Sequence, residues 1–140
     1  MKFWDSSAII PLCFKEPTSE AVKDVINGDP DIIVWWATRV ECVSALARRI
    51  REGAIAKSME AQVRGILYAL SAEWSEVQPN DVVRQRAERL LMLHPLGAAD
   101  AFQLASAMIW AQESPVGLDI VCLDRNLGQA ASREGFTVLP

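Results

Sequence analysis

Four acidic residues stand out in this chain because each lies beside an apolar segment that predicts a buried element. Asp5 and Asp124 each end an apolar run that predicts a strand, and Glu41 lies one turn into the helix after another such run. Asp100 lies near the start of a mostly apolar helix. Carboxylates brought close together repel one another and raise one another's pKa values, so they need a countercharge. Mg²⁺ or Mn²⁺ supplies it, since these ions prefer oxygen ligands and retain waters for chemistry.

Three of these acids also have a structural explanation of their own. Asp5 suits the capping position of the helix that follows it, whereas Glu41 and Asp100 suit the positive N-terminal ends of their helices. An ionised carboxylate in the apolar setting of Asp100 is costly, however, unless a cation or hydrogen bonds hold it. A functional interpretation therefore depends on whether the four acids converge.

The elements that would position the acids alternate between strand and helix. Apolar runs predict strands at 2–4, 32–36, 74–77, 119–123 and 136–139. Helical periodicity and capping residues predict helices at 6–14, 18–26, 39–51, 54–71, 79–93, 96–108 and 127–134. This alternation predicts an α/β fold, with a parallel β-sheet flanked by helices on both faces, in a single domain over residues 1–140. Ligands of such sheets bind beyond the carboxyl ends of the strands, which is where the four acids would meet.

Three helices show an apolar side that we expect to face the core. Their predicted inward residues are Val40, Val43, Leu46, Ala47 and Ile50; Ile55, Met59, Val63, Ile66, Leu67 and Leu70; and Val82, Val83, Ala87, Leu90 and Leu91. The outward arginines of the third helix, Arg84, Arg86 and Arg89, are expected to form a solvated face, with contact to a phosphate backbone as the alternative.

Composition narrows the class of protein. The 140 residues are 51% hydrophobic, which fits one domain with a single sizeable core. No apolar run reaches the length of a membrane span and no signal peptide is visible, so we expect a cytoplasmic protein without membrane contact. A net charge of −4 disfavours a broad surface for nucleic acid, but not a small site where metal ions receive a phosphate.

The cysteines and the single histidine argue against other metal sites. Cys13, Cys42 and Cys122 are widely spaced in apolar contexts, which predicts buried, reduced thiols and neither a disulfide framework nor a zinc site. A His-rich metal cluster is excluded because His94 is the only histidine.

Four segments together resemble the PIN-domain ribonucleases, and within that family the VapC-type toxins of prokaryotic toxin–antitoxin pairs. They are Phe3-Trp-Asp5-Ser-Ser7-Ala, Thr38-Arg-Val-Glu-Cys-Val, Leu96-Gly-Ala-Ala-Asp100-Ala-Phe-Gln-Leu-Ala-Ser-Ala and Val121-Cys-Leu-Asp124-Arg-Asn-Leu-Gly. The resemblance covers essentially the whole chain, and the Asp-Ala-x-x-Leu-Ala segment is its most specific part. It implies that Asp5, Glu41, Asp100 and Asp124 are the acidic quartet of the family. It also implies metal-dependent RNA cleavage, a homodimer and an antitoxin partner.

Three further residues lie near the first and last acids. The family usually has Thr or Ser where this chain has Cys122, and a thiol is a poor hydrogen-bond donor. Asp119 lies at the start of the same predicted strand, so we expect it at the far edge of the sheet and prefer Asp124 as the site residue. Ser7 could contact a water on the metal, although helix capping explains it equally well.

These residues predict hydrolysis of an RNA phosphodiester. One or two Mg²⁺ or Mn²⁺ ions would be held by Asp5, Asp100 and Asp124, with Glu41 completing the site. The resemblance implies products with a 5′-phosphate and a 3′-hydroxyl.

Two other classes of protein remain as alternatives. A receiver-like signalling domain also carries acids at strand ends, but it needs a lysine after a late strand. The lysines here, Lys2, Lys15, Lys23 and Lys57, do not follow one. A catalytically idle interaction module would also fit the apolar helices and the five tryptophans.

Overall fold

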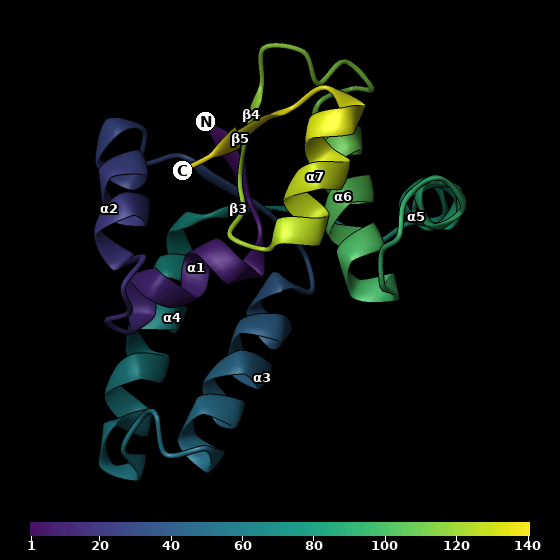
Figure 1. Ribbon diagram of the computed structural model, residues 1–140. Helices are drawn as coiled ribbons and strands as arrows, with labels where there is room; N and C mark the ends of the chain where they lie inside the picture. Colours follow the sequence, from purple (N-terminus) through teal and green to yellow (C-terminus); the bar gives the residue numbers. More distant parts are fainter.

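Five parallel strands form one sheet in the order β3-β2-β1-β4-β5 (Figure 1). The computed structural model describes all residues from 1 to 140. The strands are β1 (Lys2–Trp4), β2 (Ile32–Trp35), β3 (Ser75–Val77), β4 (Asp119–Val121) and β5 (Thr137–Leu139). The helices are α1 (Ser6–Cys13), α2 (Ser19–Gly28), α3 (Thr38–Arg51), α4 (Glu60–Glu73), α5 (Asp81–Leu93), α6 (Ala98–Trp110) and α7 (Arg125–Glu134), with a short 3₁₀ turn, η1 (Lys57–Met59).

Helices cover both faces of this sheet, because successive strand residues point to opposite sides. Phe3 packs in an apolar cluster with α5, α6 and α7, whereas the next residue, Trp4, packs in a second cluster with α1, α2, α3 and α4. Both side chains are fully buried. The predicted α/β fold, a parallel sheet between two helical layers, is confirmed.

The strand order reverses at the centre of the sheet. From β1 the chain builds outward through β2 to β3 on one side, and then returns to place β4 and β5 on the other side. Phe3 pairs with Ile33 of β2 and with Ile120 of β4. The carboxyl ends of β1 and β4 therefore border the switch point, the usual ligand-binding position of an open α/β sheet.

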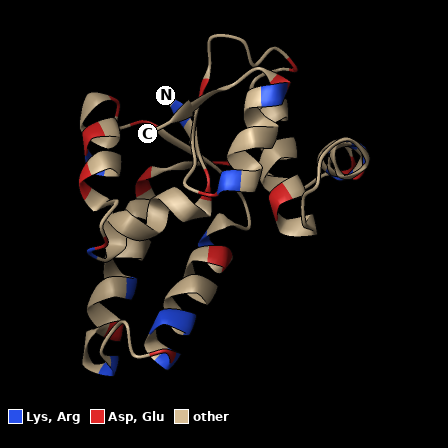
Figure 2. Ribbon diagram, viewed as in Figure 1, with Lys and Arg blue, Asp and Glu red and all other residues tan.

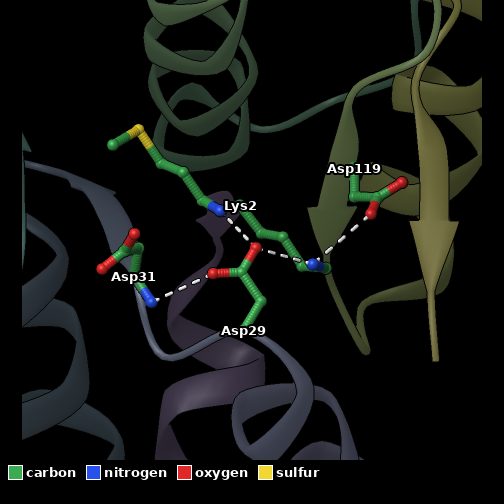
Figure 3. A network of polar contacts seen from close by, with 5 residues as sticks. Lys2, Asp29, Asp31 and Asp119 are labelled. Carbon is green, nitrogen blue, oxygen red and sulfur yellow. Dashed lines mark hydrogen bonds and ion pairs between the residues drawn. The ribbon is translucent and has the colours of Figure 1, made fainter.

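The opposite, amino edge of the sheet is held by a separate polar network (Figure 3). Lys2 Nζ lies 2.9 Å from Asp29 Oδ2 and 3.7 Å from Asp119 Oδ2, and the N-terminal ammonium of Met1 also contacts Asp29. The hydrogen bond with Asp29 raises the pKa of Lys2, and the bonds from the N-terminal ammonium and Lys2 lower the pKa of Asp29. Asp119 thus lies at the edge far from Asp124, as expected.

Some inward residues were predicted on the wrong side of their helices. Val40 is 68% exposed and Val82 is 59% exposed. The buried side of α3 contains the predicted Leu46 together with Thr38 and Cys42, and these three residues are spaced four apart. The stripe is therefore rotated relative to the one the apolar residues predict, because buried polar and sulfur-containing side chains take part in it.

The predicted helix 54–71 also begins differently. Ile55 is buried in the second apolar cluster but lies before the 3₁₀ turn, and α4 begins only at Glu60. The loop between α3 and α4 therefore contributes a buried apolar side chain, that of Ile55, to the core.

No helix of the protein has both the length and the apolar character that crossing a membrane requires.

Candidate active site

Asp5 lies directly after β1 at the switch point and is almost completely buried, with 3% of its surface exposed. Its backbone N–H donates to Val121 O over 3.0 Å, which ties it to β4. Its Oδ2 accepts hydrogen bonds from the Ser7 N–H at 3.0 Å and from Ser7 Oγ at 2.5 Å. Burial raises the pKa of Asp5, and the hydrogen bonds from Ser7 oppose this shift. Asp5 is therefore both the cap of α1 and a buried acid at the strand ends.

Ser7 joins the loops that carry two of the predicted site residues. Besides donating to Asp5, its Oγ accepts from the backbone N–H of Leu123 at 2.9 Å and of Asp124 at 3.2 Å. A hydroxyl has one hydrogen and two lone pairs, so these three bonds use its full capacity. In this arrangement Ser7 holds the end of β4 against the start of α1, which goes beyond the capping role expected from the sequence.

Cys122 faces the same carboxylate. Its Sγ lies 3.9 Å from Asp5 Oδ2 and 3.4 Å from Asp124 O, and the residue is buried. Burial raises the pKa of this thiol, so it is a neutral, weak donor beside Asp5. The hydroxyl of Ser7, not a side chain at position 122, makes the strong polar contacts here.

Asp124 is the exposed member of the set. It caps α7, since its Oδ1 accepts the backbone N–H of Leu127 over 2.8 Å. The cap fixes the side chain at the carboxyl end of β4, on the same edge as Asp5. Its charge is one cause of the raised pKa of both Asp5 and Asp100.

Glu41 is held by a residue that the sequence did not single out. Gln103 of α6 is fully buried, and its Nε2 donates to Glu41 Oε2 at 2.9 Å and to Thr38 Oγ1 at 3.0 Å. Its Oε1 has no hydrogen-bond partner. The signal that could have revealed Gln103 is its polarity among the Ala and Leu residues of a buried helix, three residues after Asp100. Thr38 is the first residue of α3 and accepts this bond.

Asp100 lies in the first turn of α6, and its side chain forms none of the hydrogen bonds or ion pairs of the structure. Its pKa is raised first by burial and then by the charges of Asp124 and Asp5. Burial is also the main cause that raises the pKa of Glu41, with the charges of Asp5 and Asp100 adding to it. Figure 2 shows acidic residues at the first turns of α3 and α6, near the strand ends.

The charge of Asp124 raises the pKa values of Asp5 and Asp100, and the charges of Asp5 and Asp100 raise that of Glu41, so each acid lies within electrostatic range of at least two others. None of them forms an ion pair with a lysine or arginine. No three His, Cys, Asp or Glu side chains are arranged so that they already surround one metal position. The donor chemistry nevertheless fits a hard divalent cation, because the site collects carboxylate oxygens and no counterion.

Fold and site together define a parallel α/β domain with an acidic, uncompensated edge at its switch point. The family model of the PIN domain matches residues 2–129, and the chain belongs to the PIN-domain family. PIN domains are generally nucleases. The receiver-like alternative is therefore wrong.

One solved structure with a similar fold is a toxin-antitoxin complex from Klebsiella pneumoniae. It shares 16% sequence identity with this chain, covers 90% of this chain and 89% of its own, and superposes with a TM-score of 0.63. A search of curated proteins finds none that matches. At this identity the similarity establishes a common fold.

Proposed function

We propose that this protein is a Mg²⁺- or Mn²⁺-dependent endoribonuclease, the toxin of a toxin–antitoxin pair. The observation that carries the proposal is the accumulation of four carboxylates at the switch point, three of them with raised pKa values, without a paired cation. Membership of the PIN-domain family supports nuclease chemistry. The similarity in fold to a toxin-antitoxin complex supports the assignment to a toxin–antitoxin pair.

Asp5, Asp100 and Asp124 are the proposed metal ligands, with Glu41 completing the site. A divalent cation bound there would neutralise charge on the phosphate and lower the pKa of an attacking water. The protein's own contribution is orientation. Ser7 holds Asp5 and the loop of Asp124 together, and Gln103 holds one oxygen of Glu41. The expected products carry a 5′-phosphate and a 3′-hydroxyl.

Substitution of the two central aspartates tests this function. Asp5→Asn and Asp100→Asn preserve shape but remove charge, and we expect each to slow the cleavage of a labelled RNA in Mg²⁺ or Mn²⁺ more than about 100-fold, since even supporting residues of metal sites cost about 10- to 100-fold. The matched control is Asp119→Asn, which changes an aspartate at the opposite end of β4 and is expected to keep full activity.

The outcomes separate the remaining classes of protein. Full cleavage by both Asn variants would show that another site acts. If the wild-type protein cleaves none of a panel of RNAs with either metal, the idle interaction module is the better interpretation.

The proposed partners are an antitoxin protein and a second copy of this chain. Light scattering after size-exclusion chromatography should report the mass of a dimer for the protein alone. Co-expression with the product of an adjacent gene should suppress RNA cleavage. The cytoplasm is the proposed compartment, because Cys13, Cys42 and Cys122 are all free and buried, which fits a reducing environment.

A further inference from the structure

Two clefts each include one of the four acidic residues in their lining. The first is between the start of α1 and α3, has a volume of about 420 Å³, and contains Glu41 and Arg48 in its lining. The second runs from the loop after β4 along α7 to the start of β5, has a volume of about 530 Å³, and contains Asp124 and Arg125. Each cleft therefore combines one of the four acids with one arginine.

These two arginines have no carboxylate partner in the protein. Arg48 and Arg125 are exposed and form none of the ion pairs of the structure. Arg48 lies seven residues after Glu41, so two helical turns, about 10 Å, separate them along one side of α3. Arg125 is the first residue of α7 and directly follows Asp124. Figure 2 shows basic residues at the first turn of α7 and along α3 beyond its acidic first turn.

The other arginines either form an ion pair or line neither of the two clefts. Arg49 pairs with Glu16 over 2.6 Å, and Arg86 pairs with Glu113. Arg84 pairs with Asp81 within α5 over 3.0 Å. Of the α5 arginines considered for phosphate contact, only Arg89 is exposed and free of an ion pair, and it lines neither cleft. The structure therefore gives the α5 arginines no part in a path that leads to the acids.

We propose that single-stranded RNA crosses the carboxyl edge of the sheet from one cleft to the other, with Arg48 and Arg125 binding phosphates on either side of the scissile bond. This inference rests on the proposed function. Four carboxylates repel the RNA backbone, so flanking cations are needed to hold it across them. Because the two arginines have no ion pair to give up, binding a phosphate breaks no existing contact. Each cleft lies within the range of about 300–1,000 Å³ that holds a small ligand, a size that fits a nucleotide and not a duplex.

Steady-state cleavage kinetics of an unstructured RNA test the path. Arg48→Ala and Arg125→Ala are each expected to raise KM about tenfold, the usual loss for a charge-assisted hydrogen bond, with kcat little changed. The dependence of KM on salt should weaken by about 0.7 in log–log slope for each lost phosphate contact. Arg48→Lys and Arg125→Lys should retain most of the binding that the Ala variants lose, because lysine also binds phosphate as a point charge.

The matched control is Arg89→Ala, which removes an exposed, unpaired arginine of α5 and should change neither KM nor the salt slope. If the wild-type protein cleaves RNA while the Arg48 and Arg125 variants behave like the Arg89 variant, the RNA path is wrong and the nuclease function stands. If the wild-type protein cleaves no RNA, the proposed function fails and the path falls with it.

Discussion

A single hydroxyl, that of Ser7, connects two of the proposed metal ligands. Its three hydrogen bonds reach Asp5, Leu123 and Asp124, which belong to loops more than a hundred residues apart in the chain. The Ser7 hydroxyl cannot be removed without cost, because the backbone N–H groups of Leu123 and Asp124 both donate to its oxygen. The site therefore rests on a residue that need not itself touch metal or RNA.

Ser7→Ala is predicted to destabilise the fold and to impair cleavage. The loss leaves the N–H groups of Leu123 and Asp124 without a partner, at a cost of about 1–3 kcal/mol. Chemical denaturation checks the free energy of unfolding, and RNA cleavage checks the site. Ser71→Ala is the control, since Ser71 bonds only the exposed carbonyl of Tyr68. Equal stability of the two variants would refute the linking role of Ser7.

Gln103 is predicted to position Glu41 for metal binding. Gln103→Leu keeps the volume of the side chain but removes the donor to Glu41 Oε2 and Thr38 Oγ1. We expect Mn²⁺ affinity, measured by calorimetry, to fall by about 10- to 100-fold, as for other residues that support metal ligands. Unchanged affinity in a folded variant would mean that Glu41 needs no such support.

At the scale of elements, the sequence predicts the strands better than the faces of the helices. Each predicted strand exists, including the short β3. Short runs rich in β-branched and aromatic residues, bounded by turn residues, are a direct signal of strands. The predicted orientation of α3 was wrong at Val40, because the predicted apolar stripe did not include the polar residue Thr38, which is buried. The buried Thr38 is held there by the hydrogen bond from Gln103, and no single-sequence pattern contains that partner.

The turn between α7 and β5 depends on Gly135. Its φ of +112° is strained for other residues, and an added Cβ would lie 3.3 Å from Pro115 Cγ. Gly135→Ala is predicted to cost about 1–3 kcal/mol in the free energy of unfolding, measured by urea denaturation.

The contrasting variant is Gly65→Ala in the interior of α4, where a Cβ meets open space. It is expected to stabilise the protein by about 0.5–1 kcal/mol. A similar effect of both substitutions would contradict the assigned backbone of the turn.

For the whole molecule, the acidic edge is a source of instability that a bound cation would relieve. Asp5, Glu41 and Asp100 each have a raised pKa, so the folded state holds their protons more tightly than the unfolded state does. Stability from this source is complete below the unfolded pKa values of 3.8 and 4.5 and is lost as the pH rises through the folded values.

Asp100→Asn is therefore predicted to raise the Tm of the metal-free protein by a few degrees at neutral pH. The gain over the wild-type protein should shrink as the pH falls below the raised pKa of Asp100, and it should vanish below the unfolded value of 3.8. Differential scanning calorimetry across this range checks it. A variant that is less stable at neutral pH, or a gain in Tm that does not depend on pH, would show that the ionised carboxylate of Asp100 does not destabilise the folded protein.

The shared edge of Asp5 and Asp124 could be predicted because strand ends in a parallel sheet lie together. Asp5 and Asp124 follow directly from that rule, and Asp119 was correctly expected at the other edge. The contacts that hold the acids could not be predicted, since Ser7 and Gln103 act through partners distant in the chain. The sequence likewise does not show which arginines are free of ion pairs and line a cleft, because both properties arise only in the folded protein.

Calorimetric titration of the purified protein with Mn²⁺ decides whether the acidic edge is a metal site. We predict saturable binding by the wild-type protein and by Asp119→Asn, and a loss of binding in Asp5→Asn and Asp100→Asn, all four proteins remaining folded. Equal binding by all four proteins, or none by the wild-type protein, would contradict a metal site at these carboxylates.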